Sequence, residues 1–223
     1  MIELAVFLGN PGKKYARNRH NAGFLLAEKL PFINAISWQK KFKGSYAAME
    51  RKHLAEFVSA EIPLESPDEA RLHFIKPETF MNLSGESAAA ASSFYKIKND
   101  SILAVHDELE LPLGTISLKF SGGLGGHNGL RSMRACLGNA DFWRIRIGIG
   151  RPDSRLPGEG GPPGSGEGIV DWVLSDFSAA ERETLDRVLD AASELLLLAL
   201  AGDPASLLPE WGKKKISVLT PAE

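Results

Sequence analysis

Two short apolar segments, each ending in polar residues, constrain the fold of this 223-residue chain more than any other feature. Residues 2–9 are rich in β-forming residues and are cut off by Asn10 and the Pro-Gly pair after it, which predicts a buried strand and a tight turn. Residues 101–105 repeat the pattern and run into Asp107. Strands that are apolar throughout need cover on both faces, as in a parallel sheet. Ligands of such sheets bind beyond the carboxyl ends of the strands, where we expect both polar residues.

Extended and helical patterns alternate along the rest of the chain. The predicted strands cover residues 44–60, 72–75, 111–120 and 143–149, and the predicted helices cover about 21–30, 79–96, 128–137 and 185–200. Residues 111–120 are broken by Pro112 and Gly114, which favours an edge strand or hairpin. The pattern therefore predicts an α/β fold with a twisted, mixed but mostly parallel sheet flanked by helices.

Three helix starts have recognisable caps. Asn21 and Asn128 stand where the N-caps of two predicted helices are expected. Ser178 and Glu181 have the spacing of a capping box in front of the last long helix.

The chain length suits one domain. We expect residues 1–212 to form a single catalytic α/β domain and residues 213–223, beginning with three lysines, to form a basic tail. Residues 153–168 are rich in proline and glycine, which predicts a flexible loop within the domain.

Composition narrows the cellular setting. Cys136 is the single cysteine, so an intramolecular disulfide and a metal site built from cysteines are excluded. The longest apolar run, residues 195–201, is too short to cross a bilayer, and the N-terminus lacks a signal-peptide pattern. We therefore expect a cytoplasmic protein without a membrane partner.

The net charge of −2 is unevenly distributed along the chain. Residues 1–155 hold 21 Lys and Arg against 16 Asp and Glu, whereas residues 156–223 hold 5 against 12. The basic part can face a polyanion, although an ordinary solvated surface explains the same numbers.

His20 is the first candidate for acid–base chemistry, because it lies in the polar loop 13–20 rather than on an apolar face. A histidine near neutral pKa can serve as a general base. Asp107 is its natural partner, since a carboxylate bonded to one ring nitrogen orients the imidazole and stabilises its protonated form. Glu108 and Glu110 are rival carboxylates, and all of these residues can also be read as solvated surface groups.

The sequence favours water as the nucleophile. No serine lies in a Gly-x-Ser-x-Gly elbow, and Cys136 sits in an apolar helical stretch. The five histidines show no HExxH or similar ligand spacing, so we expect neither a catalytic metal nor a cofactor.

Other residues can bind a substrate. Asn10, Asn82 and Asn128 end predicted elements, and each amide can donate to a developing oxyanion or simply cap a turn. A glycine-rich run, residues 122–129, precedes a helix and can bind anions, but it is neither a P-loop nor a dinucleotide-binding motif. Three basic residues flank this run and either hold a nucleic-acid backbone or remain solvated: Lys119, Arg131 and Arg134.

Together these residues resemble a known family, the bacterial-type peptidyl-tRNA hydrolases. The matching segments run in order along the chain: GNPGKKY (9–15) with RHNAG (19–23), KPETFMNLSG (76–85), HDELELP (106–112), GGLGGHNGL (122–130) and RIRIGIG (144–150). The resemblance departs from the family pattern in the Pro/Gly-rich segment 153–168 and at Leu124.

The resemblance implies a monomeric carboxylic ester hydrolase that cuts the bond between a peptide and the terminal ribose of tRNA. It implies that His20 is the catalytic base, Asp107 its partner and Asn10 a further catalytic residue. The residues that it assigns to the peptide, the 3′ end and the tRNA backbone are Tyr15, Met81, Asn82, His127, Asn128, Lys119 and Arg146.

Two other functions stay open at this stage. The first is a non-catalytic RNA-binding relative of the same fold, although a pure binder has no need of a poised base. The second is a nucleotide-binding α/β enzyme that uses the glycine-rich run.

Overall fold

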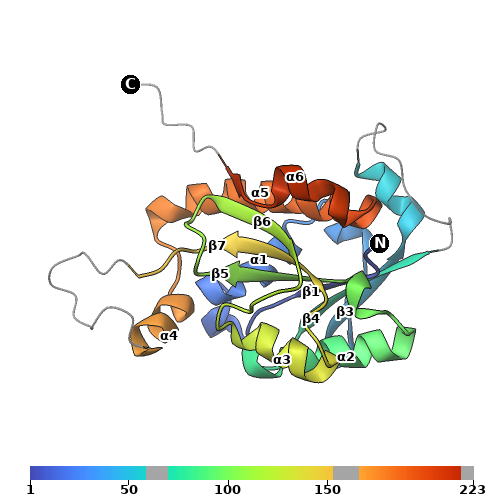
Figure 1. Ribbon diagram of the computed structural model, residues 1–223, viewed down its shortest axis with the longest axis horizontal. Helices are drawn as coiled ribbons and strands as arrows, with labels where there is room; N and C mark the ends of the chain where they lie inside the picture. The colour runs from blue at the N-terminus through green and yellow to red at the C-terminus, as the bar shows by residue number, and fades with distance from the viewer. Residues whose placement is uncertain (59–69, 153–165, 217–223) are drawn as a thin grey trace, which may run out of the picture.

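The computed structural model describes residues 1–58, 70–152 and 166–216, which form one eight-stranded sheet with helices on both faces (Figure 1). The strand order is β2-β3-β4-β1-β5-β7-β6-β8. The strands are β1 (Leu4–Phe7), β2 (Gln39–Lys41), β3 (Gly44–Glu50), β4 (Arg71–Pro77), β5 (Ile102–Glu108), β6 (Thr115–Phe120), β7 (Trp143–Gly148) and β8 (Lys214–Lys215).

The four central strands β4, β1, β5 and β7 are parallel. Antiparallel strands extend the sheet at both ends, with β3 and β2 beyond β4 and with β6 and β8 beyond β7. The predicted mixed α/β sheet is confirmed, but three pairings of the described strands are parallel and four are antiparallel, so the parallel part forms the centre and not, as expected, most of the sheet. The carboxyl ends of β1 and β5 lie side by side there, and this places Asn10 and Asp107 at one edge.

Helices α1 and α5 cover one face of the sheet, and α2 and α3 cover the other. The α-helices are α1 (Ala22–Glu28), α2 (Ser84–Tyr95), α3 (Asn128–Leu137), α4 (Gly166–Leu174), α5 (Ala179–Ala201) and α6 (Leu208–Trp211). Short 3-10 helices connect them: η1 (Lys13–Tyr15), η2 (Arg19–Asn21), η3 (Ile33–Ala35), η4 (Arg51–Glu56), η5 (Met81–Leu83), η6 (Asn99–Ser101) and η7 (Pro204–Leu207). None of the helices in the described ranges is long and apolar enough to cross a membrane.

The first strand shows why its sequence is apolar throughout. Ala5 and Phe7 point into the core under α1 and α5, whereas Leu4 and Val6 point into the core under α2 and α3. Successive side chains of a strand alternate between the two faces of the sheet. A strand covered by helices on both faces therefore has apolar residues at every position.

Some predicted element boundaries were wrong. The strand predicted for residues 44–60 ends at Glu50, where the chain enters η4 and the buried Arg51 guanidinium donates to the carbonyls of Ile2 and Leu200. The helix predicted for 79–96 begins only at residue 84, because Phe80 is extended (φ −62°, ψ 155°) and η5 follows it.

Parts of the segments predicted as a loop and as a tail form regular secondary structure. Residues 166–168, predicted as the end of a loop, open α4, whereas residues 153–165 of that loop lie outside the described residues. Lys214 and Lys215, predicted as part of a basic tail, pair with Ile116 and Thr115 as β8. The capping box predicted at Ser178 and Glu181 is confirmed at the start of α5.

Gly23 lets α1 approach the sheet closely. A Cβ at this position would lie 2.5 Å from the carbonyl oxygen of Leu8 and 2.6 Å from that of Val105. Both contacts are with backbone, which cannot rotate away. The absence of a side chain at Gly23 therefore sets how near the segment carrying His20 lies to β1 and β5.

We expect Gly23→Ala to lower the free energy of unfolding by about 1–3 kcal/mol, the usual range for overpacking, as measured by urea denaturation. The control is Gly202→Ala, because no atom lies within 4 Å of a Cβ built there and the change should stay within about 0.5 kcal/mol. Equal stability of the two variants would show that the close approach at Gly23 is unimportant.

Candidate active site

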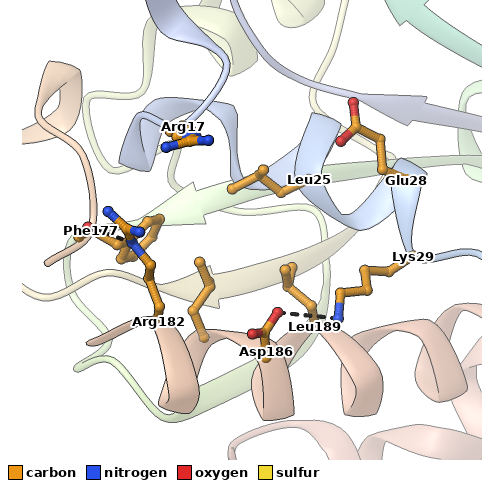
Figure 2. Close-up of a pocket in the computed structure, with 9 residues that line it drawn as sticks. Arg17, Leu25, Glu28, Lys29, Phe177, Arg182, Asp186 and Leu189 are labelled. Carbon is orange, nitrogen blue, oxygen red and sulfur yellow. Dashed lines mark hydrogen bonds and ion pairs between the residues drawn. The ribbon is translucent and has the colours of Figure 1, made fainter. Parts of the chain in front are cut away.

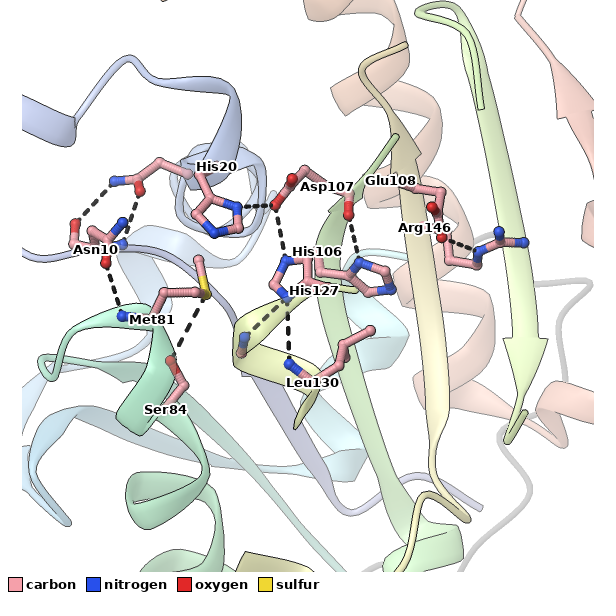
Figure 3. A network of polar contacts seen from close by, with 12 residues as sticks. Asn10, His20, Met81, Ser84, His106, Asp107, Glu108, His127, Leu130 and Arg146 are labelled. Carbon is pink, nitrogen blue, oxygen red and sulfur yellow. Dashed lines mark hydrogen bonds and ion pairs between the residues drawn. The ribbon is translucent and has the colours of Figure 1, made fainter. Parts of the chain in front are cut away.

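His20 and Asp107 meet at the carboxyl edge of the sheet, as their positions in the sequence predict (Figure 3). His20 lies on η2, directly before α1, and Asp107 is the sixth residue of β5. His20 Nδ1 and Asp107 Oδ1 are 2.8 Å apart, and both residues are buried. Of the two rival carboxylates, Glu108 binds Arg146 and Glu110 pairs with Arg151.

A second imidazole shares the same carboxylate oxygen. His127 Nε2 lies 3.0 Å from Asp107 Oδ1, while its Nδ1 accepts hydrogen bonds from the backbone N–H groups of Gly129 and Leu130. His127 is therefore the N-cap of α3, and the prediction that Asn128 caps this helix was wrong. Because Nδ1 accepts, the proton of His127 resides on Nε2 and is donated to Asp107.

These contacts move the pKa values of the pair in opposite directions. Burial raises the pKa of Asp107, but the charges and hydrogen bonds of His20 and His127 outweigh it and hold that pKa well below its usual range. Burial lowers the pKa of His20, and the charge and hydrogen bond of Asp107 more than offset this, so that its pKa lies above the ordinary 6.5. Asp107 is thus an anion that stabilises a protonated His20.

Asn10 is held as a hydrogen-bond donor. Its side-chain Oδ1 accepts from the backbone N–H of Met81 at 2.8 Å, so its amide nitrogen faces away from Met81 and makes no hydrogen bond to the described residues. The backbone N–H of Asn10 donates to Asn21 Oδ1, and Asn21 Nδ2 donates to the Asn10 carbonyl, at 2.8 and 3.0 Å. The prediction that the Asn21 side chain caps α1 was therefore wrong: Asn21 binds the backbone of Asn10, in the segment that follows β1.

The remaining predicted cleft residues lie on the elements around this centre. Met81 and Asn82 belong to η5, and Asn128 opens α3. These two elements pack closely, since a Cβ on Gly129 would lie 2.6 Å from Met81 Sδ. Asn82 and Asn128 are exposed, and Tyr15 is half-buried on η1.

The predicted backbone-binding residues lie on β6 and β7. Arg146 donates through Nε to Glu108 Oε2 at 2.9 Å and so is largely engaged within the protein, whereas Lys119 is half-buried and has no partner among the described residues. The buried Arg144 was not predicted as a site residue. Its guanidinium donates to the carbonyls of Gly123 and Ser121 and holds the start of the glycine-rich run against the sheet.

His20, Asp107 and His127 are also the residues that could hold a metal ion, because their ligand atoms lie within 4.8 Å of one another. Asp107 Oδ1 already accepts from both imidazoles. A cation at this point would have to replace both hydrogen bonds, so the arrangement fits a hydrogen-bonded triad better than a metal centre.

Arg19, next to the candidate base, has a role that sequence reasoning missed. Its guanidinium donates to both carboxylate oxygens of Glu181 at 2.7 and 2.8 Å and stacks over the Trp172 ring at 3.9 Å. It also donates to Ser175 Oγ and to the Asp176 carbonyl. The segment carrying His20 is thereby fastened to α4 and to the start of α5. Only the proximity of Arg19 to His20 hinted at this, since Glu181 lies 162 residues away.

The chain is similar to known proteins over nearly its whole length. Residues 4–217 match the family described as Peptidyl-tRNA hydrolase. The chain belongs to this family. A family member named peptidyl-tRNA hydrolase from Treponema pallidum is 43% identical over 218 residues, 96% of each chain. One from Rhodospirillum centenum is 42% identical over 204 residues, which cover 91% of this chain and 78% of that protein.

Solved structures of the family share the fold. A crystal structure of peptidyl-tRNA hydrolase in complex with N-propanol has a TM-score of 0.76 and 33% identity, covering 95% of this chain and 94% of that one. The crystal structure of peptidyl-tRNA hydrolase from Acinetobacter baumannii has a TM-score of 0.73 at the same identity, covering 95% and 92%.

We expect Glu181→Gln to lower the free energy of unfolding by about 1–3 kcal/mol, because the buried Arg19 loses its charged acceptor. Glutamine can still serve in the capping box, so the change isolates the ion pair. Urea denaturation measures it. The matched control is Glu183→Gln on the same helix, whose exposed pair with Arg187 should contribute no more than about 1 kcal/mol. Similar losses in both variants would contradict the role given to Arg19.

Proposed function

We propose that this chain hydrolyses the ester bond between a peptide and the 3′-terminal ribose of tRNA, with His20 activating the attacking water. The observation that supports this most directly is the hydrogen bond between His20 Nδ1 and Asp107. It keeps the imidazole proton on Nδ1 and leaves the Nε2 lone pair free to accept a proton. Family membership supplies the substrate class.

The proposed reaction is a direct attack by water. His20 Nε2 takes a proton as the water oxygen bonds to the ester carbonyl carbon, and Asp107 stabilises the imidazolium that forms. The carbonyl oxygen becomes an oxyanion, and the free amide nitrogen of Asn10 is oriented to donate to it. The ribose–acyl bond then breaks, and the imidazolium returns its proton to the leaving ribose oxygen.

Asn10 suits this role because of the contact that orients it. The Met81 N–H occupies its side-chain oxygen, so only the amide nitrogen is left for the substrate. A donor held in place before the reaction stabilises a developing charge without further reorganisation.

The substrate-binding assignments follow from placement around this centre. We assign Tyr15, Met81, Asn82, His127 and Asn128 to the peptide and the tRNA 3′ end, with His127 acting through Asp107. Lys119 and Arg146 are assigned to the phosphate backbone, where contacts are salt-sensitive and insensitive to sequence. A monomer, a cytoplasmic location and the absence of a metal or cofactor stay predictions.

Release of labelled peptide from N-acetyl-aminoacyl-tRNA, measured with chelator present, tests the proposal. We expect the purified chain to cleave this substrate and His20→Ala to lose at least about 100-fold in kcat, the low end of general-base contributions. His53→Ala is the control, because His53 is exposed on η4, and it should keep full activity.

Two outcomes would contradict the proposal. No cleavage, with salt-sensitive tRNA binding retained, would support the non-catalytic RNA-binding alternative. Cleavage that chelation abolishes and added metal restores would point instead to a metal held by His20, Asp107 and His127.

The pH dependence of kcat/KM tests whether Asp107 raises the pKa of His20. His20 acts as a base only when neutral, and Asp107 raises its pKa above 6.5, so activity should rise with pH along a limb centred above that value. Asp107→Asn removes the cause of the raised pKa, so the limb should shift to lower pH while kcat falls about 10²- to 10⁴-fold. Glu110→Gln, at an exposed carboxylate nearby, should leave the limb unmoved. An unshifted limb in Asp107→Asn would contradict the pairing.

A further inference from the structure

A pocket of about 410 Å³ lies between α1 and the first turns of α5, and none of the residues assigned to the reaction or to tRNA binding lines it (Figure 2). Its apolar lining comes from Leu25 on α1, from Leu185 and Leu189 on α5, and from Phe177 just before α5. The volume falls within the range of small-molecule sites, which combine such a lining with a few polar groups.

The polar groups of the pocket are arranged asymmetrically. Figure 2 shows Arg17 and Arg182 toward one end and Glu28 and Lys29 toward the other. At the second end, Lys29 is neutralised by Asp186 at 3.1 Å. Positive charge in excess is therefore found only at the arginine end.

Both arginines keep donors available. Arg17 is exposed and makes no hydrogen bond or ion pair with the part of the chain that the structure describes. Arg182 donates through Nε to the Phe177 carbonyl at 3.3 Å, which anchors the guanidinium beside the pocket and leaves its two terminal nitrogens free of described partners. Guanidinium groups bind carboxylates through paired hydrogen bonds.

We propose that this pocket binds a small amphipathic carboxylate, with the carboxylate between Arg17 and Arg182 and an apolar body on Leu25, Leu185 and Leu189. A second negative group is disfavoured, because Glu28 lies toward the far end and the charge of Lys29 there is already neutralised by Asp186. Two kinds of ligand carry a carboxylate next to an apolar body: a free medium-chain fatty acid, and the carboxyl terminus of a peptide that ends in an apolar residue. The site is separate from the cleft at His20, so it stands or falls independently of the proposed hydrolysis.

NMR titration of the ¹⁵N-labelled full chain tests the proposal with octanoate and with N-acetyl-leucine. We expect saturable shifts of the amide signals of Leu25 and Leu189. Binding of octanoate alone identifies the fatty-acid source, binding of N-acetyl-leucine alone identifies the peptide source, and binding of either supports the site. The uncharged analogues 1-octanol and N-acetyl-leucinamide should bind about tenfold more weakly or not at all, because they lack the charge-assisted hydrogen bonds.

Variants test whether Arg17 and Arg182 bind the carboxylate or whether any positive charge near the pocket is sufficient. Arg17→Gln and Arg182→Gln should each weaken binding by about tenfold. Arg187→Gln, on the same helix but outside the pocket, should leave it unchanged, and matching amide spectra of the free variants show that each is folded. The proposal is overturned if neither probe saturates, if the uncharged analogues bind equally well, or if the shifts fall on Asn10 and Met81 instead.

Discussion

One carboxylate oxygen, Asp107 Oδ1, organises the candidate active site. It accepts from His20, which lies on η2 directly before α1, and from His127, which caps α3. The two helices pack on opposite faces of the sheet, so the end of β5 joins the two layers at the point where chemistry is proposed. A buried anion is costly unless it is fully hydrogen-bonded, and this requirement makes the positions of both imidazoles depend on Asp107.

The segment that follows β1 is also held in place by hydrogen bonds. Asn10 follows β1 and is held by Asn21 through its backbone and by Met81 through its side chain. The segment after β1, the start of α1 and the start of η5 are therefore tied together. Arg19 adds a third attachment, to Glu181 at the start of α5. The loop that carries His20 is thus held from several directions, which suits a base that must meet a water in one geometry.

The two helix-cap predictions that were wrong share a cause. Asn21 and Asn128 were expected to cap helices, because asparagine at such a position usually binds the nearby backbone N–H groups. In the structure Asn21 binds Asn10, 11 residues away, and His127 takes over the cap of α3 while also binding Asp107. In this candidate active site, each of these side chains binds a residue of another segment. That contact outweighs the local preference of asparagine for capping a helix.

The sequence by itself determined most of the strands and helices, though not all of their ends, as well as the mixed α/β sheet and the edge at which Asn10, His20 and Asp107 would gather. Those features depend on apolar periodicity and on turn residues, which act over a few positions. Only the tertiary structure decided that Asp107 rather than Glu108 binds His20, that the Asn10 side-chain oxygen is occupied by the Met81 N–H, and that Arg19 and His127 hold the elements around His20 and Asp107. Hydrogen-bond partners 20 to 162 residues apart are brought together by packing, and no local pattern in the chain encodes them.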